Sequence, residues 1–180
     1  MIERRIKLTD DYEISRVING GWQLSDGHAL LEANDMNDAR EAFAKLIDEG
    51  FTTFDCADIY TGVEEFIGGL VKERKQSKGY DDTQVHTKFV PDAEALATVD
   101  RAYVERIITR SIKRLNKERL DLVQFHWWDY DIPGYVEAAG HLLDLKNEGL
   151  IANIACTNFD TPRLAQLLDA GIPVVSNQIQ

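Results

Sequence analysis

The feature that most constrains this chain is a regular alternation of short apolar segments with segments of helical spacing. Six segments have the composition of buried strands, because they are apolar along nearly their whole length instead of at every second residue. These strand segments are residues 16–22, 51–57, 84–90, 120–127, 150–159 and 173–180. Helices are expected between them, at residues 37–49, 101–117 and 135–148 and in the segments that begin near residues 61 and 161. Strands that alternate with helices predict parallel βαβ units.

Two of the expected helices carry start signals. The segment Thr61–Glu64 has the spacing of a capping box, which predicts that a helix begins there. Thr161 is expected to cap the last helix, with Pro162 in its first turn. The apolar residues of this last helix that we expect to be buried are Leu164, Leu167 and Leu168.

The length and the pattern favour one domain over residues 1–180, with enough chain to bury a sizeable core. Six consecutive βα units fit two α/β architectures, a doubly wound open sheet or part of a (β/α)₈ barrel. The alternation by itself leaves both architectures open.

Composition and charge argue against several classes of function. The net charge of −11 argues against binding of nucleic-acid phosphates as the main activity. No apolar run approaches the roughly 18 residues of a membrane span, and residues 1–7 lack the apolar stretch of a signal peptide. Cys56 and Cys156 lie in apolar strand segments without metal-ligand spacing, so we expect buried free thiols. A cytoplasmic protein without a membrane or nucleic-acid partner is the expectation that fits these features.

Charged and polar residues interrupt three of the apolar strand segments. Asp55, Lys88 and His126 each lie near the carboxyl end of an expected strand, which is the end where barrels and open α/β sheets build their sites. A buried ammonium or carboxylate costs several kcal/mol unless it is paired, so these residues call for partners and can serve one another. Tyr60 follows Asp55 by five residues in the next loop and is expected to join them.

These four residue types predict a proton-donating site without a metal. A tyrosine beside a lysine ammonium has its pKa pulled below the usual value of about 10, because the cation favours the phenolate. Tyr60 could then donate a proton near neutral pH, and His126 could orient a carbonyl oxygen.

Each residue also has a structural interpretation. Asp55 could tie down a loop, Tyr60 could cover the core, and Lys88 could extend to the barrel rim. His126 could be a hydrogen-bonded core histidine, as we expect for His86 on a strand face toward a helix. The occurrence of all four residues on successive strands favours a common site over four separate structural roles.

Asp55, Tyr60, Lys88 and His126 together resemble the catalytic tetrad of the aldo-keto reductases, in both order and spacing. Residues 111–127 are similar to the third helix and fourth strand of that family, and residues 147–159 are similar to its fifth strand. There Thr157 stands where the family usually has serine, and Asn177-Gln178 resembles the sixth-strand motif.

The resemblance implies a (β/α)₈ barrel with NADPH lying across its carboxyl-end mouth. It implies cofactor contacts from five residues, which are Gly21, Asp55, Thr157, Asn158 and Gln178. Trp22 and Trp127 match positions beside the substrate. The implied reaction is hydride transfer from NADPH to a small aldehyde or ketone. The family's roles make Tyr60 the general acid, Lys88 the modulator of its pKa, Asp55 the partner of the lysine, and His126 the group that orients the carbonyl.

One departure from the family is the length. A full barrel takes about 250 residues, whereas this sequence of 180 residues reaches only the sixth expected strand, so we expect an incomplete barrel of about six βα units. The sequence is expected to be a fragment, or else a decayed homologue, and the intact tetrad favours the fragment. The sixth strand, residues 174–179, is expected to present an open edge through which the chain self-associates.

Two other functions are open at this point. Some members of the family serve as non-catalytic, cofactor-sensing subunits of other proteins. A metal-dependent barrel hydrolase would need clustered histidine and carboxylate ligands at strand ends, and only His126 is well placed for that. The residues name neither the physiological substrate nor the preference for NADPH over NADH.

Overall fold

The computed structural model describes residues 4–25 and 35–180. The chain forms two compact units, residues 1–86 with 113–117 and residues 87–112 with 118–180. The first unit contains β1 (Arg5–Thr9), β2 (Tyr12–Ser15), β3 (Asn19–Gly20), the short 3₁₀ helix η1 (Trp22–Leu24), α1 (Asp35–Asp48), β4 (Thr53–Asp55) and α2 (Val63–Lys78). The second contains η2 (Ala93–Thr98), most of α3 (Arg101–Arg114), β6 (Leu122–Phe125), α4 (Tyr135–Asn147), β7 (Ile154–Thr157), α5 (Thr161–Asp169) and β8 (Val174–Gln178). Strand β5 (Gln84–Phe89) contributes residues to both units.

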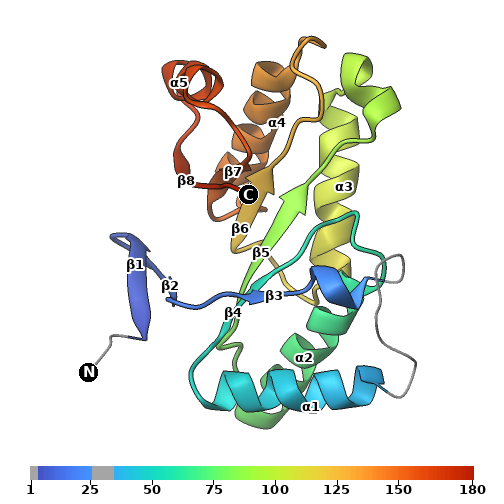
Figure 1. The fold of residues 1–180 in the computed structure, drawn as a ribbon, viewed down its shortest axis with the longest axis vertical. Coiled ribbons are helices and arrows are strands. Elements are labelled where there is room, and N and C mark those ends of the chain that lie inside the picture. Colours follow the sequence, from blue (N-terminus) through green and yellow to red (C-terminus); the bar gives the residue numbers. More distant parts are fainter. Residues whose placement is uncertain (1–3, 26–34) are drawn as a thin grey trace. The chain divides into compact units, whose positions relative to one another are not determined.

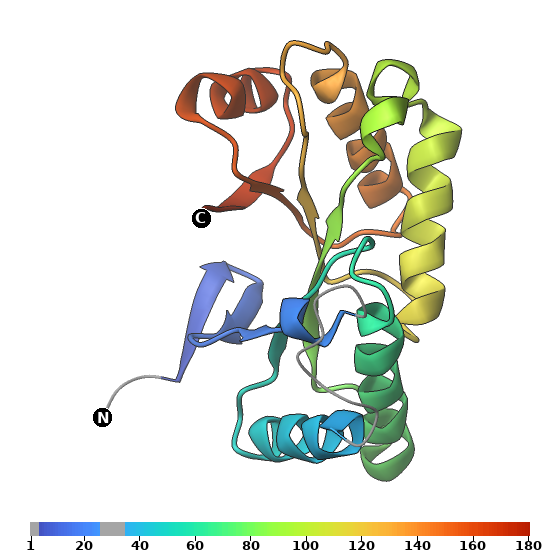
Figure 2. The ribbon, with the colours of Figure 1, turned by 45° about the vertical axis from the view of Figure 1, so that its right-hand side comes forward.

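Strands β3 to β8 are ordered as they occur in the chain, β3-β4-β5-β6-β7-β8. The pairs β3–β4, β4–β5, β6–β7 and β7–β8 are parallel (Figures 1 and 2). A doubly wound sheet reverses its strand order at a switch point, whereas a barrel adds strands in sequence. The order therefore confirms the α/β class and the incomplete (β/α)₈ barrel that the resemblance implied.

The core of the first unit lies between the helices and the start of the sheet. Phe43 of α1 stacks on Phe54 of β4 at 5.5 Å between ring centroids and meets Phe66 of α2 edge-on at 5.6 Å. The apolar face expected for α2 is buried, and its residues are Val63, Phe66, Ile67, Leu70 and Val71. Helix α2 is thus held to the sheet by the stripe that its spacing indicates.

An antiparallel hairpin of β1 and β2 precedes the sheet, and the polar N-terminal sequence gave no expectation of it. Reciprocal hydrogen bonds fasten it to the start of β4: Ser15 N donates to Thr53 Oγ1 at 2.8 Å, and Thr52 N donates to Ser15 Oγ at 2.8 Å. The hydroxyl of Tyr12 lies 3.1 Å from Nε2 of His86. The expectation that His86 faces a helix is therefore wrong, because the hairpin supplies its polar partner.

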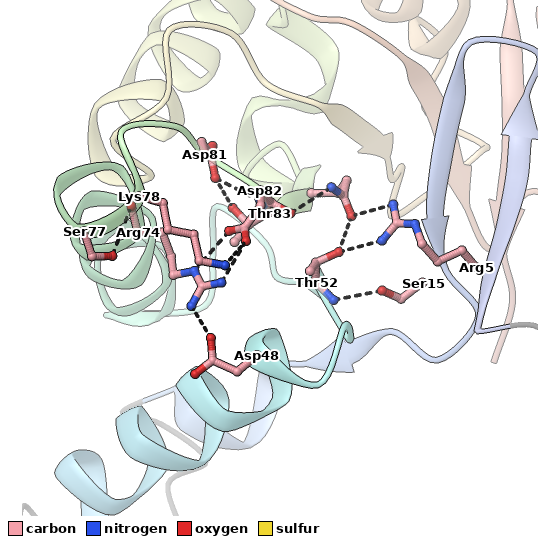
Figure 3. A network of polar contacts seen from close by, with 11 residues as sticks. Arg5, Ser15, Asp48, Thr52, Arg74, Ser77, Lys78, Asp81, Asp82 and Thr83 are labelled. Carbon is pink, nitrogen blue, oxygen red and sulfur yellow. Dashed lines mark hydrogen bonds and ion pairs between the residues drawn. The ribbon is translucent and has the colours of Figure 1, made fainter.

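A network of ion pairs joins α1, α2 and the segment before β5 (Figure 3). Arg74 of α2 donates to Asp48 of α1 at 2.6 Å and to Asp82 at 2.7 and 3.0 Å. Hydrogen bonds from the Arg74 guanidinium and, to a smaller extent, from the Lys78 ammonium lower the pKa of Asp82 to about 2. On the hairpin side of the same view, Arg5 donates to Thr52 Oγ1 at 2.9 Å.

The core of the second unit is rich in aromatic side chains. Phe125 of β6 stacks on Phe89 of β5 at 5.8 Å and contacts Trp127 and Phe159 at 5.9 and 5.5 Å between centroids. Helices α4 and α5 pack side by side (Figures 1 and 2). Cys156 of β7 is buried here and Cys56 is buried in the first unit, and both are free thiols as expected. Burial raises the pKa of Cys156 to about 12.

Two helix starts differ from the sequence interpretation. Helix α2 begins at Val63 after Gly62, whose φ is 82° and which makes no side-chain cap, so the capping box over Thr61–Glu64 does not form. Asp160, not Thr161, caps α5 by accepting from Arg163 N at 2.9 Å. A carboxylate one residue earlier can reach the free amides of the first turn, which a hydroxyl already inside the helix cannot.

The buried stripe of α5 is narrower than expected. Leu167 is fully buried, but Leu168 is 51% exposed. Among the described helices, α5 packs beside α4. The side of α5 that contains Leu167 is therefore covered, whereas the next residue, Leu168, faces outward. Among the described residues, no helix is long and apolar enough to cross a membrane.

Candidate active site

The ten residues expected at the site follow or end strands of the sheet, and each unit carries part of the set. The first unit holds Gly21, Trp22, Asp55 and Tyr60, after β3, at the end of β4 and in the loop that follows. The second holds Lys88, His126, Trp127, Thr157, Asn158 and Gln178, at or just beyond the ends of β5, β6, β7 and β8. In parallel α/β folds, this end of the strands is where ligands bind.

Gly21 and Asp55 join the ends of β3 and β4. The amide of Gly21 donates to the carbonyl oxygen of Asp55 at 2.8 Å. A Cβ atom at position 21 would lie 2.7 Å from Cγ1 of Val63 and 3.1 Å from the Asp55 oxygen. Glycine is therefore required here, because any side chain would push these elements apart. The next residue, Trp22, is 46% exposed.

Tyr60 lies in a tight turn between β4 and α2. Its amide donates to Ala57 O at 3.1 Å, and its carbonyl accepts from the amide of Val63 at 3.1 Å. Burial, the charge of Asp55 and that of Cys56, in that order, raise the pKa of Tyr60 to about 12. The expectation of a lowered pKa is wrong for this structure, because burial disfavours the phenolate and the charge of Asp55 raises the pKa further. Tyr60 is therefore a neutral phenol at physiological pH.

Lys88 lies in β5 and is 6% exposed. An ammonium group this deep in a strand is costly without polar surroundings, which distinguishes Lys88 from a surface lysine. Its positive charge acts on His126, where it contributes to a lowered pKa.

His126 directly follows β6 and is held by the strands on both sides. Its amide donates to Phe89 O of β5 at 3.1 Å, and its Nδ1 lies 3.4 Å from the carbonyl oxygen of Thr157 in β7. Burial is the main cause of the lowered pKa of His126; the Thr157 carbonyl opposes the shift and Lys88 adds to it. His126 is therefore a neutral imidazole at physiological pH.

Two neighbouring tryptophans follow His126 and have opposite surroundings. Trp127 is 1% exposed, and its indole N–H donates to Ile132 O at 3.1 Å. Trp128 is 52% exposed, and its ring meets the His126 ring at 90° with 4.6 Å between centroids. Its indole N–H donates to Pro91 O at 2.9 Å. Trp128, which the sequence interpretation passed over, is thus the exposed aromatic residue beside His126.

The ends of β7 and β8 are tied together around Asn158. This residue has a φ of 59°, its amide donates to Gln178 O at 2.8 Å, and its side-chain oxygen accepts from Gln180 N at 3.1 Å. The side chain of Asn177 hydrogen-bonds the backbone of Phe159 in both directions, at 2.8 and 3.3 Å. Beside them, the hydroxyl Oγ1 of Thr157 is buried and makes no hydrogen bond to any residue that the structure describes. A buried hydroxyl without a partner costs about 1–3 kcal/mol, so Thr157 has hydrogen-bonding capacity available for a ligand.

The polar side chains of the two sets carry a carboxylate and a phenol in the first unit, and ammonium, imidazole, hydroxyl and amide groups in the second. Among residues 4–25 and 35–180, the structure has no group of three or more His, Cys, Asp or Glu side chains that could hold a metal ion. The residues present are suited to hydrogen bonding and proton transfer.

The chain is similar to known reductases over nearly its whole length. The model of the aldo/keto reductase family matches residues 16–180. Methylglyoxal reductase DkgA of Yersinia pestis is 30% identical over 97% of this chain and 56% of its own length. Aldo-keto reductase YhdN of Bacillus subtilis is 28% identical over 84% of this chain and 46% of its own length.

Solved structures of aldo-keto reductases are also similar to this chain. An aldo-keto reductase of Bombyx mori in complex with NADP is 25% identical with a TM-score of 0.78, over 98% of this chain and 57% of that chain. Another aldo-keto reductase, complexed with NADPH, is 26% identical with a TM-score of 0.80, over 98% of this chain and 54% of that chain. This chain thus spans about half the length of the relatives it matches. The family match over residues 16–180 shows that it belongs to the aldo/keto reductase family.

Proposed function

We propose that this protein reduces small aldehydes or ketones to alcohols with NADPH as the hydride source. The observation that carries the proposal is the series of polar residues at the carboxyl ends of successive strands, Asp55, Lys88 and His126, in a chain of this family. Relatives named methylglyoxal reductase and glyoxal reductase support a small carbonyl compound as the substrate class. Relatives solved with NADP and NADPH support the cofactor.

The residues present fit a nicotinamide cofactor. The buried hydroxyl of Thr157 has no hydrogen-bond partner among residues 4–25 and 35–180, and a carboxamide supplies both a donor and an acceptor. We propose that Thr157, Asn158 and Gln178 bind the carboxamide, and that Gly21 and Asp55 border the cofactor on the side of β3 and β4. When bound, NADPH supplies the hydride that adds to the carbonyl carbon.

Tyr60 is proposed to supply the proton. As negative charge develops on the carbonyl oxygen, the O–H bond of Tyr60 would break and its proton would pass to that oxygen. A phenol with a pKa of about 12 keeps its proton at neutral pH and is still a far stronger acid than an alcohol. The products would be the alcohol, a tyrosinate and the oxidised cofactor NADP⁺. Lys88 is proposed to stabilise the tyrosinate charge, with Asp55 as the partner of the lysine.

His126 is proposed to hydrogen-bond the substrate oxygen. Because a backbone carbonyl can only accept, the contact with Thr157 O places a proton on Nδ1. The neutral ring then has a bare Nε2, which can accept from an alcohol. Only the protonated ring can donate to a carbonyl oxygen. His126 is therefore expected to favour carbonyl reduction in its protonated form and alcohol oxidation in its neutral form.

The test is a measurement of NADPH binding and NADPH oxidation by the same preparation, with methylglyoxal and an aromatic aldehyde as substrates. Binding together with aldehyde-dependent oxidation supports the proposal. Binding without turnover of any carbonyl compound favours the cofactor-sensing subunit instead. Absence of both would overturn the reductase proposal for this chain.

A further inference from the structure

We infer that Trp128 is a positioning residue that fixes the orientation of the His126 imidazole. The inference deepens the proposed function, because it concerns the histidine proposed to contact the substrate oxygen. Trp127 has a different role, since its ring is enclosed in the core and packs edge-on against Phe125.

The first support is the geometry around the imidazole. The ring is contacted at Nδ1 by Thr157 O, at 3.4 Å, and by the Trp128 ring, at 4.6 Å between centroids and 90° between planes. A perpendicular contact at this distance is a favourable arrangement for two aromatic rings. The torsion that turns an imidazole is broad and nearly two-fold, so a 3.4 Å hydrogen bond alone is a weak restraint. The Trp128 ring supplies a second restraint, because it holds the plane of the imidazole, and the Thr157 carbonyl then favours Nδ1 over Cδ2 at the edge that faces it.

The second support is that Trp128 is itself held in place without being buried. It is 52% exposed, yet its indole N–H donates to Pro91 O at 2.9 Å, just beyond β5. His126 is tied to the same strand, because its amide donates to Phe89 O. The end of β5 therefore holds both residues. It binds the backbone amide of His126 through Phe89 O and the indole N–H of Trp128 through Pro91 O. An exposed tryptophan held by a hydrogen bond and packed on one imidazole is more than a surface residue with incidental contacts.

Two consequences follow for His126. The ring should carry its proton on Nδ1 when neutral, because Trp128 holds the ring plane in which Nδ1 can donate to the Thr157 carbonyl. Trp128 also packs against the His126 ring and so shields it from water. Burial is the main cause of the lowered pKa of His126, and Lys88 is the charged group that adds to this shift. Removal of Trp128 should therefore release the tautomer preference and raise the pKa of His126 toward its ordinary value.

The experiment compares four versions of the 180-residue chain labelled with ¹⁵N at histidine, which are wild type, Trp128→Ala, Trp128→Phe and Leu168→Ala. Leu168 is the matched control, since it lies in the same unit and is 51% exposed against 52% for Trp128. His126→Asn identifies the His126 signals. The readouts are the ¹⁵N shifts of the neutral ring, which distinguish a proton on Nδ1 from one on Nε2, and the pH titration of the same signals.

The expected result is an Nδ1-protonated ring in wild type and in Leu168→Ala. Trp128→Ala should show a mixture of tautomers and a higher pKa, and Trp128→Phe should lie between them, because it keeps an aromatic ring but loses the bond to Pro91. If Trp128→Ala and Trp128→Phe both keep the wild-type tautomer and pKa, the inference is overturned. Should Trp128→Ala fail to fold, the comparison of Trp128→Phe with Leu168→Ala decides.

Turnover separates this inference from the proposed function. If the chain reduces aldehydes, Trp128→Ala should lower kcat roughly 10- to 100-fold with a smaller change in KM, as expected when a reacting group is misplaced. A wild-type chain without reductase activity would contradict the proposed function, while the ring tautomer would still decide the role of Trp128.

Discussion

The Nδ1 atom of His126 lies 3.4 Å from the carbonyl oxygen of Thr157, and this contact links the end of β6 to the end of β7. Because the oxygen can only accept, the contact determines which ring nitrogen carries the proton. The same residue of β7 also contributes a buried hydroxyl with no partner in the described part of the chain. One threonine thus orients the proposed carbonyl-binding group through its backbone and offers its side chain to the proposed cofactor.

The rate of carbonyl reduction should depend on the protonation of His126. Burial and Lys88 lower its pKa, so the ring is protonated only below its ordinary value of about 6.5. Reduction should therefore be fastest below that pKa and should fall as the pH rises through it, while alcohol oxidation should rise over the same range. The pH profiles of both directions, in wild type and in His126→Gln, check this. Profiles in wild type that match those of His126→Gln would contradict it.

Lys88→Met should raise the pKa of His126. The ammonium is one of the causes of the lowered value, and methionine keeps most of the volume of the lysine stem without its charge. Titration of His126 by NMR measures the change. Lys113→Met, at an exposed position of α3, is the control and should leave the titration as in wild type. A His126 pKa that does not move in Lys88→Met would show that the two groups do not interact.

Gly21→Ala should destabilise the first unit by about 1–3 kcal/mol, the usual cost of an overpacked site. The added Cβ would lie 2.7 Å from Val63 and 3.1 Å from Asp55 O, so β3, β4 or α2 must shift. Gly20→Ala is the matched control, because a Cβ at position 20 would have no neighbour within 4 Å. Urea unfolding of both variants provides the measurement, and Val63→Ala should partly restore Gly21→Ala. Equal stability of the two glycine variants would contradict the packing argument.

The isolated chain of 180 residues should self-associate. Ile179, just beyond β8, is 75% exposed, and among the described strands β8 pairs only with β7. An exposed apolar strand edge is a template for association. Size-exclusion chromatography with light scattering over a range of concentrations measures the mass of the particles in solution. Ile179→Lys should lower this mass toward that of a single chain. A monomer at every concentration would overturn this expectation.

The strand-end placement of Asp55, Lys88 and His126 could be predicted from the residue pattern, because buried parallel strands are apolar throughout and a charge inside one stands out. The strand order could not, because the same alternation also fits a doubly wound sheet, and only the resemblance to the family implied the barrel. The apolar face of α2 could be predicted for a similar reason, since its spacing is regular. The hairpin could not, because it is fastened by bonds from Ser15 N to the Thr53 hydroxyl and from Thr52 N to the Ser15 hydroxyl, which no periodicity indicates.

The electrostatics of the site were less predictable than its residues. The pKa of Tyr60 depends on how much water reaches the phenol and on the charges nearest to it, and both are set by tertiary packing. The different surroundings of Trp127 and Trp128 could not be predicted either. Strand β6 ends at Phe125, and beyond a strand the alternation of side chains no longer fixes their direction.

The comparison of wild type with Tyr60→Phe tests the central proposal most directly. The measurement is aldehyde-dependent oxidation of NADPH, together with NADPH affinity, for the two proteins and for Tyr80→Phe as a control at an exposed tyrosine. We expect Tyr60→Phe to fold and to bind NADPH as wild type does, while turnover falls by roughly 10²–10⁴, the range for loss of a general acid. Tyr80→Phe should leave turnover unchanged. A Tyr60→Phe protein that reduces aldehydes at the wild-type rate would contradict the assignment of Tyr60 as the proton donor.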